Sequence, residues 1–348
     1  MKITKIYCNA VGPLFNKTIL FEHEWTEKTA DKILLTGPNG CGKSILLRGI
    51  ATLWEALAYW LDQRKPLPRK HPIKQWLQQW GGFAVVLEDL TAINAHIPEK
   101  IGLFFGTNDW LEQLTAENNQ QPICWIGEVY DPKRTLLLPA NAWLDEWLEK
   151  RKRLILNAEK VEAPNLIYLD AEERRWVSPR KNISASFPDD LTQRWLTRYS
   201  ATDDWKGQLE SSLINLKTTA LHKYHETIRA FNDFLVGKNI DPNIKMGENR
   251  LYVKVKGKPP HLLDDLSSGE RQILILLFLL HRWLQPNAVI LIDEPDLYLH
   301  PSLIDLLLDA IEKAAAKQNT QLIITSHNVD VWRRYENMGM RIDLQGEV

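Results

Sequence analysis

Residues 33–44 read Ile-Leu-Leu-Thr-Gly-Pro-Asn-Gly-Cys-Gly-Lys-Ser, an apolar run that leads directly into a glycine-rich loop. Apolar side chains then recur at helical spacing as far as Trp60, which predicts a strand, a loop and a helix in that order. Gly37 is followed, after four residues, by Gly42-Lys43-Ser44, which is the spacing of a phosphate-binding loop. In such a loop, glycines let backbone N–H groups converge on an anion beside the positive end of a helix. A glycine turn that only happens to precede Lys-Ser is the less favoured interpretation.

The residues of this loop have different expected roles. We expect Lys43 to reach the β- and γ-phosphates of a bound nucleotide and the Ser44 hydroxyl to be a ligand of Mg²⁺. The Cys41 thiol is expected to be filler, because the loop binds through its backbone. The residues expected to contact the nucleotide here are Gly37, Pro38, Asn39, Gly40, Cys41, Gly42, Lys43, Ser44 and Ile45.

Composition limits the class of protein. The 348 residues, 25% charged and 44% hydrophobic, are typical of a globular chain with a large core. The net charge of −1 gives no general signal of nucleic-acid binding, so any such surface must be local. No apolar stretch is long enough to cross a membrane, no signal peptide is recognisable, and three cysteines at unrelated spacings suggest neither disulfides nor a zinc site. We therefore expect a cytoplasmic protein that does not act in a membrane.

Strand-like and helical patterns alternate through the first two thirds of the chain. Residues 2–25 predict a hairpin broken at Gly12-Pro13, and residues 64–72 predict an exposed basic loop with three prolines. Three further β-like runs predict an antiparallel sheet beside the nucleotide-binding core. These runs are 83–88, 100–105 and 123–130; helical patterns cover 140–160 and 189–236, and more strands are expected at 165–170 and 249–256.

A serine-containing turn opens an apolar helix in the last third of the chain. Residues 266–272 read Leu-Ser-Ser-Gly-Glu-Arg-Gln, and the helical pattern continues to about Trp283. Taken alone, Ser267 with Glu270 is a capping box, a frequent helix start with no function attached. Its meaning therefore depends on the segments that follow.

An aliphatic run at 288–292 ends in two adjacent carboxylates, Asp293 and Glu294, before Pro295. Such a run is typical of a central parallel strand buried on both faces, and ligands bind at the carboxyl edge of such sheets. We expect Asp293 to hold Mg²⁺ and Glu294 to orient or deprotonate the water that attacks the γ-phosphate. Two carboxylates that only solvate a strand end are the alternative.

A second aliphatic run, 321–325, leads to His327. A single histidine at a strand end is more often structural than catalytic. Because it follows the loop and the carboxylate pair in order, we favour a sensor of the γ-phosphate.

Together these segments resemble the head of ABC-type ATPases. Residues 37–44 are similar to the Walker A motif, 266–272 to the signature motif, 289–294 to the Walker B motif, 296–301 to the D-loop and His327 to the switch histidine. The wording Asp-Glu-Pro-Asp-Leu-Tyr-Leu-His-Pro resembles the RecF/SMC-like branch of "AAA family" ATPases, which includes OLD nucleases and PtuA-type defence ATPases. We expect neither a long coiled coil nor a Toprim nuclease domain in this chain.

The resemblance implies an α/β fold of the ABC-ATPase P-loop type, with a mixed central sheet, an antiparallel β subdomain and a helical insertion. We expect one composite head over 1–348, made of an N-terminal lobe (1–135), a mainly helical insertion (136–240) and a C-terminal lobe (241–348). The Q-loop glutamine of such heads is not obvious, and Gln120 or Gln121 is the best candidate.

The resemblance also implies a mechanism that uses two copies of the chain. The signature residues Ser267, Ser268, Gly269 and Glu270 would contact ATP held by the partner's loop, so that ATP and Mg²⁺ join a homodimer or higher oligomer. Lys43, Glu294 and His327 would be the catalytic residues for hydrolysis.

The biological role has several readings. The leading one is an ATPase of bacterial anti-phage defence that controls a separate effector, a nuclease or toxin. The alternatives are a RecF-like DNA repair ATPase, the energising subunit of a transporter, and a scaffold that uses ATP only to assemble. Contact with nucleic acid is compatible with local basic clusters at 64–74, 150–153, 174–176 and 180–181, although charged faces balanced by nearby acids are at least as good an explanation.

Overall fold

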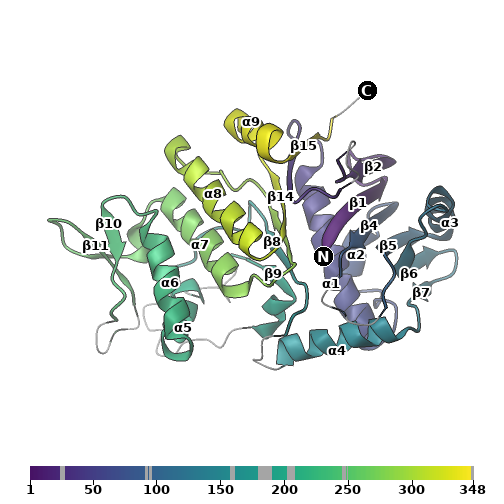
Figure 1. Ribbon diagram of the computed structural model, residues 1–348, viewed down its shortest axis with the longest axis horizontal. Helices are drawn as coiled ribbons and strands as arrows, with labels where there is room; N and C mark the ends of the chain where they lie inside the picture. Colours follow the sequence, from purple (N-terminus) through teal and green to yellow (C-terminus); the bar gives the residue numbers. More distant parts are fainter. Residues whose placement is uncertain are drawn as a thin grey trace.

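The computed structural model describes residues 1–23, 28–90, 93, 96–156, 161–178, 190–201, 208–244, 248 and 250–345. A six-stranded sheet in which every neighbouring pair is parallel forms its centre (Figure 1). The strand order is β15 (Met340–Asp343), β3 (Lys32–Thr36), β14 (Gln321–Thr325), β13 (Val289–Ile292), β8 (Leu166–Leu169) and β9 (Leu196–Arg198).

The aliphatic runs form central strands because both faces of the sheet are covered. Along β13, Val289 and Leu291 pack into one core, while Ile290 and Ile292 pack into a second core on the opposite face. Helix α1 (Lys43–Gln63) covers the first face, and α7 (Ser268–Trp283) with α8 (Pro301–Lys317) covers the second (Figure 1). All four residues of β13 are fully buried, as a parallel strand between two helical layers requires.

A second six-stranded sheet packs on the other side of α1, which shares one core with both sheets. The predicted hairpin is confirmed, because β1 and β2 pair antiparallel. The three following β-like runs are also strands, but the expectation that they are all antiparallel is wrong: β5 and β6 are parallel, because α3 (Asn108–Glu117) connects them as a crossover. The order is β2 (Lys17–Leu20), β1 (Lys2–Asn9), β4 (Gly82–Glu88), β5 (Ile101–Thr107), β6 (Cys124–Asp131) and β7 (Thr135–Leu137).

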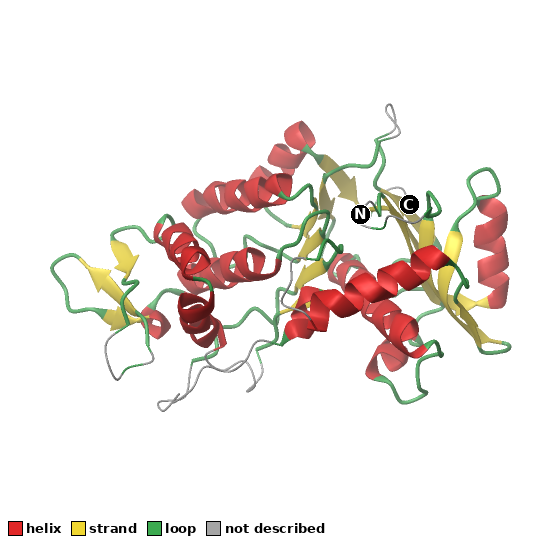
Figure 2. Ribbon diagram, turned by 60° about the horizontal axis from the view of Figure 1, so that its bottom comes forward, coloured by secondary structure: helices red, strands yellow, loops and turns green. Residues whose placement is uncertain are grey.

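The remaining elements extend the two ends of the molecule. Figure 2 shows a small three-stranded sheet at the end opposite the mixed sheet. Its strands are β10 (Lys238–Ile240), β11 (Tyr252–Val255) and β12 (His261–Leu262); the other elements are α2 (Pro72–Leu77), α4 (Ala142–Leu156), η1 (Leu191–Arg194), α5 (Gln208–Thr219), α6 (Leu221–Asn232), η3 (Leu263–Asp265) and α9 (Val329–Met338).

The predicted α/β fold class is confirmed, but the strand directions within the two large sheets differ from the prediction. The central sheet is parallel throughout, since its edge strands β15 and β9 also pair in parallel. The mixed sheet is the second one, in which β5 and β6 are parallel and the other pairs are antiparallel. The helical prediction for 189–236 is wrong at β9, a three-residue strand too short to show a period, which pairs with β8. The limits 1–135, 136–240 and 241–348 stay a prediction. Among the described residues, no helix combines the length and apolarity that crossing a bilayer requires.

Candidate nucleotide-binding and catalytic site

Three neighbouring strands of the parallel sheet end at the predicted site. The glycine-rich loop follows β3, Asp293 and Glu294 follow β13, and His327 follows β14, which lies between these two strands. Because parallel strands place their carboxyl ends at one edge, segments that are about 250 residues apart in sequence meet there. The order of strands therefore brings together the side chains that the sequence analysis singled out.

Two glycines of the loop are required by its backbone. Gly42, the residue before α1, has a φ of 101°, and a Cβ there would lie 2.8 Å from Leu14 Cγ. Gly37 has a φ of 137°, and its Cβ would lie 2.7 Å from Cys41 Sγ. Left-handed backbone and close packing together exclude larger residues. The loop can therefore present its N–H groups to an anion at the start of α1.

Lys43 lies inside the loop it follows. Its side chain is buried, and its Nζ donates hydrogen bonds to the carbonyl oxygens of Gly37 (2.8 Å) and Pro38 (3.0 Å). Ser44, one residue on, lines a cavity of about 450 Å³ together with Asp293 and Glu294. The Ser44 hydroxyl and the two carboxylates thus border one space, which suits Mg²⁺, and Lys43 lies one residue away along the chain.

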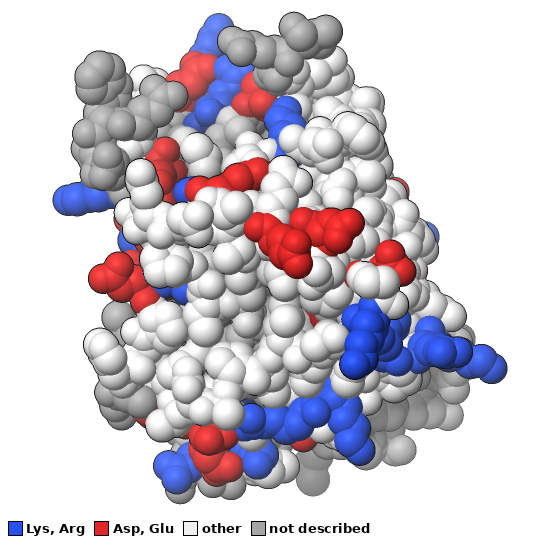
Figure 3. Space-filling view, turned by 90° about the vertical axis from the view of Figure 1, so that its right-hand side faces the viewer, with Lys and Arg blue, Asp and Glu red and all other residues white. Residues whose placement is uncertain are grey.

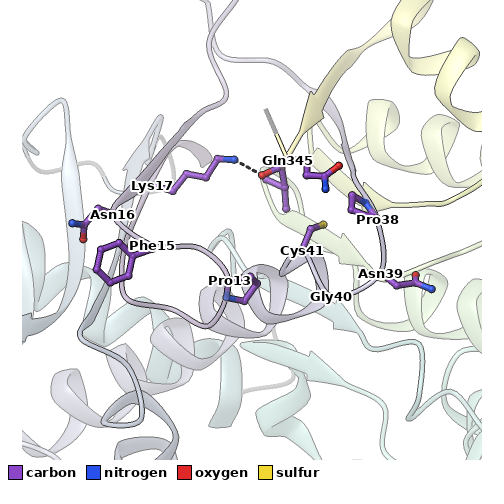
Figure 4. Close-up of a pocket in the computed structure, with 10 residues that line it drawn as sticks. Pro13, Phe15, Asn16, Lys17, Pro38, Asn39, Gly40, Cys41 and Gln345 are labelled. Carbon is purple, nitrogen blue, oxygen red and sulfur yellow. Dashed lines mark hydrogen bonds between the residues drawn. The ribbon is translucent and has the colours of Figure 1, made fainter. Parts of the chain in front are cut away.

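A second cavity, of about 580 Å³, lies on the other side of the loop. Figure 4 shows residues of the β1–β2 connection on one side and residues 38–41 of the loop on the other. Lys17 closes part of the rim by donating a hydrogen bond to the Leu344 carbonyl. Phe15 lines this cavity although 71% of its surface is exposed, so its ring offers an aromatic face of the kind on which bases stack. Phe15 is not among the residues that the sequence predicts for the site; its only signal is that it is an aromatic residue inside a predicted turn.

Thr325, the last residue of β14, links the two carboxylate positions and was also missed. Its buried hydroxyl donates to Asp293 Oδ1 (2.6 Å) and accepts from the backbone N–H of Glu294 (2.9 Å). Asp293 is only 4% exposed, so this hydrogen bond fixes one carboxylate oxygen and leaves the other for the cavity. A threonine at the end of an aliphatic strand is common, so the sequence gave no sign that Thr325 belongs to the site.

Glu294 is held in an unusual conformation and is only partly neutralised. Its φ is 45°, and its Oε1 lies 3.4 Å from Nε2 of His327. Burial and the neighbouring Asp293 carboxylate raise the pKa of Glu294, whereas His327 and Lys43 act in the opposite direction. A partly exposed carboxylate with a raised pKa, beside a histidine and a polar cavity, fits the general base that the sequence predicts.

A buried arginine underlies the carboxylate pair. Arg174 is 1% exposed, and its guanidinium donates to the carbonyl oxygens of Asp293 (2.7 Å) and Glu294 (2.7 Å). Its Nε donates to Gln272 Oε1 on α7 (3.3 Å), and Gln272 donates back to the Arg174 carbonyl. Burial lowers the pKa of Arg174 to about 10, against the opposing charge of Asp293, so the side chain stays cationic at neutral pH. Arg174 therefore joins the helix that begins at the signature residues to the strand end that carries Glu294.

The sequence contained a weak signal for this arginine. Residues 170–174, which read Asp-Ala-Glu-Glu-Arg, and the next residue, Arg175, follow β8, the strand beside β13, so this segment reaches the same sheet edge. Glu172 and Arg175 of this segment line the cavity with Ser44. By contrast, the Q-loop candidates Gln120 and Gln121 stay a prediction: both are exposed, precede β6 in the other sheet and do not line the cavity with Ser44.

The signature residues do not line either cavity beside their own loop. Ser267 and Ser268 are exposed at the start of α7, and Gly269 lies so close to the Tyr298 carbonyl that a Cβ would be 2.9 Å away. The capping box is present: the Ser267 N–H donates to Glu270 Oε2 (2.8 Å), and Ser267 Oγ accepts from the Glu270 N–H (3.3 Å). Burial opposes ionisation of Glu270, but hydrogen bonds from Lys238 and Ser267 hold its pKa below the usual value. The start of α7 thus packs against Tyr298, which lines the cavity with Ser44, but does not line that cavity itself.

Comparison with known proteins assigns the chain to a family. Residues 33–331 match the family described as "AAA domain, putative AbiEii toxin, Type IV TA system". The chain belongs to this family. It is an AAA-type ATPase domain with the motif order of ABC and SMC heads.

One individual relative shares only part of its length with the chain, at low sequence identity. A probable ABC transporter ATP-binding protein, p29 of Mesomycoplasma hyorhinis, is 28% identical over 148 residues, which are 38% of this chain and 56% of that protein. The chain thus spans little more than half the length of this relative.

The solved structures found by comparison share little sequence identity with the chain. An SMC head bound to the C-winged helix domain of ScpA shares 13% identity, with 94% of this chain and 90% of that chain covered and a TM-score of 0.47. The SMC head domain from Thermotoga maritima shares 16%, with 96% and 92% covered and a TM-score of 0.39. A dimeric ATP-binding cassette bound to ADP and Pi shares 13%, with 95% and 90% covered and a TM-score of 0.38. The family assignment rests on the match over residues 33–331.

Proposed function

We propose that this AAA-domain protein binds ATP between two copies of itself, hydrolyses it, and uses the cycle to control a separate effector in bacterial defence. The observation that carries the proposal is the meeting of Lys43, Ser44, Asp293, Glu294 and His327 at one edge of the parallel sheet.

In the proposed reaction, the chain positions water and phosphate. Glu294 takes a proton from the attacking water, the water oxygen bonds to the γ-phosphorus, and the bond to the bridging oxygen breaks to leave ADP and phosphate. Lys43 neutralises charge on the phosphates, and His327, close to Glu294, contacts the γ-phosphate. Ser44 and Asp293 are hard oxygen donors beside one cavity, a set that suits Mg²⁺, which would neutralise phosphate charge when bound.

The position of the signature residues supports dimerisation. Ser268 at the start of α7 is exposed and lies outside the cavities of its own chain, so we take a second copy as the source of the phosphate it binds. Two such contacts in a two-fold dimer, at about 1.5–3 kcal/mol per charge-assisted hydrogen bond, would couple ATP binding to association.

Mixing two inactive variants tests whether the sites are shared. Lys43→Ala removes the phosphate cation, and Ser268→Arg blocks the signature end; each variant alone should be inactive. In a mixed dimer, one site has both an intact loop and an intact signature, so an equal mixture should recover up to about a quarter of the wild-type rate. A mixture that stays inactive would contradict shared sites, and full activity of Ser268→Arg alone would remove the signature residues from the mechanism.

The effector is proposed from the family description, which includes "Type IV TA system" and thus a toxin–antitoxin context. The protein encoded beside this chain should form a complex with it whose lifetime depends on ATP, and Glu294→Gln should prolong that complex. Association that is equal with and without ATP would contradict control by the nucleotide cycle.

A second candidate, an ATPase that acts on DNA, is favoured by one observation: the cationic surface described in the next subsection. DNA-stimulated hydrolysis with a steep dependence on salt would support it over the effector reading.

A further inference from the structure

Two basic loops lie side by side at one edge of the mixed sheet, and we propose that together they bind the phosphate backbone of a nucleic-acid duplex. The first loop, 64–71, connects α1 to α2; the second, 131–135, connects β6 to β7. We call residues 64–71 and 131–135 the basic double loop. The proposal is independent of the ATPase cycle.

A buried carboxylate fixes the two loops to each other. Glu128 on β6 is fully buried, and its Oε2 accepts from the backbone N–H of Leu67, itself fully buried, at 2.8 Å. Its Oε1 accepts from Lys74, which is 2% exposed, and from Arg134 Nε at 2.8 Å. The expectation that the whole 64–72 loop is exposed is therefore wrong at Leu67. Both loops are held in place before anything binds, so little ordering entropy would be lost on binding.

The cations that remain on this surface are free. Lys65, Arg69, Lys70 and Lys133 are exposed, and none of them makes an ion pair with any residue that the structure describes. Residues 61–74 and 128–135 hold seven Lys or Arg against three Asp or Glu, an excess of four positive charges on a chain whose net charge is −1. Figure 3 shows Lys and Arg gathered over the lower part of this face of the molecule.

The other basic clusters are different. On α4, Arg151 pairs with Asp62 and lies over the Trp195 ring at 5.2 Å, while Lys150 and Lys152 pair with acids of the same helix. Arg174 is buried beneath the catalytic edge, and the cluster at 180–181 lies outside the described residues. For Lys150, Arg151 and Lys152 the interpretation as a balanced helix face is confirmed, whereas the four exposed cations of the basic double loop have no ion-pair partner among the described residues.

The chemistry of the surface selects the partner. None of the exposed large hydrophobic side chains in the described chain lies in residues 61–74 or 128–135, so the surface lacks the apolar anchors typical of protein interfaces and membrane docking. It also lacks exposed aromatic rings, on which single-stranded bases stack. Free cations on a fixed, polar surface match the backbone contacts that position proteins on a duplex.

Fluorescence anisotropy with a labelled DNA duplex of about 24 base pairs tests the proposal, without ATP and over a range of salt concentrations. If about four phosphates are neutralised, the logarithm of the association constant should fall with the logarithm of salt concentration at a slope of about −3.6. The variant Lys65→Gln, Arg69→Gln, Lys70→Gln, Lys133→Gln should bind about 100-fold or more weakly at low salt and show a slope near zero.

A matched control removes four cations from elements outside the basic double loop: α6, the β11–β12 connection and the end of α8. Arg229, Lys256, Lys258 and Lys317 also make no ion pair with a described residue, and their change to Gln should leave the slope intact. Equal loss in both variants would overturn the proposal, because it would show an effect of net charge alone. Absence of duplex binding by the wild type, or binding to vesicles containing phosphatidylserine but not to duplex, would also overturn it. ATP hydrolysis by both variants should equal that of the wild type, so failure here leaves the proposed ATPase cycle standing.

Discussion

Glu294 and Glu128 are two carboxylates on two sheets, and their surroundings are opposite. Glu128 is fully buried and accepts hydrogen bonds from Lys74, Arg134 and the Leu67 backbone. Glu294 is partly exposed, and its Oε1 lies 3.4 Å from Nε2 of His327. Glu128 lies within β6, paired with strands on both sides, whereas Glu294 lies two residues beyond the end of β13.

The difference shows how the molecule distributes its charges. A buried carboxylate whose two oxygens both accept hydrogen bonds from the protein stabilises the structure and is not available to a substrate. A partly exposed carboxylate with a raised pKa is costly for folding but available for chemistry. The comparison predicts that changes at Glu294 act on the reaction and changes at Glu128 act on stability.

Glu294→Gln should give the largest effect. The amide cannot accept the proton of the attacking water, so kcat for ATP hydrolysis should fall by about 10²–10⁴-fold while ATP still binds and holds the dimer. Single-turnover hydrolysis and size-exclusion chromatography with ATP measure the two effects. Hydrolysis at the parent rate would show that Glu294 is not the base. The midpoint temperature of thermal unfolding should change little, because the substitution removes a carboxylate charge whose burial is itself costly.

Glu128→Gln should act in the opposite way. Lys74 would keep a buried charge without a counterion, so the free energy of unfolding should fall by about 3–5 kcal/mol, measured by urea unfolding. ATP hydrolysis per folded molecule should remain near the parent value. Glu128→Leu combined with Lys74→Met removes both charges and should recover part of the loss; a single variant as stable as the parent would mean that the pair is not structural.

Arg174→Lys tests the link between the signature helix and Glu294. A single ammonium cannot donate to Asp293, Glu294 and Gln272 in the fixed geometry of a guanidinium, so kcat should fall about 10-fold, with little change in KM for ATP. Arg151→Lys is the matched control, since it also removes a buried guanidinium, and kcat should be unchanged. Equal losses in kcat for the two variants would indicate general destabilisation.

The dependence of hydrolysis on pH should give the smallest effect. The active form of Glu294 is the carboxylate, and its pKa lies above the usual value because of burial and the Asp293 charge. The rate should therefore decline as pH falls through this raised pKa, at higher pH than for an ordinary glutamate. A kcat profile of the wild type measures this; a profile that stays flat to the usual pKa of glutamate would mean that Glu294 does not titrate in the rate-limiting step.

The local segments could be predicted from the sequence because each carries its own period or spacing. The loop at 37–44 and the strands at 289–292 and 321–325 lie where expected. The strand β9 was missed because three residues cannot show a period, and the parallel β5–β6 pair because strand direction depends on the path of α3.

The site residues that the sequence did not predict were missed for a different reason. Thr325 and Phe15 are unremarkable in sequence, and Arg174 stands out there only as part of a basic cluster. Each acts through a neighbour distant in sequence: Asp293 for Thr325, the loop at 38–41 for Phe15 and Gln272 for Arg174. The exposed basic loop was expected, whereas its attachment to Glu128 could not be, because 61 residues separate Leu67 from its acceptor.

The sequence by itself determined the nucleotide-binding loop, the carboxylate pair and the order of the signature segments, because backbone freedom and charge at fixed spacing are local properties. The tertiary structure decided which carboxylate is saturated and which is left available, which arginine is buried beneath the site, and which cations stay free. Those properties depend on burial and on partners from distant strands, and only the packing of the two sheets around α1 supplies them.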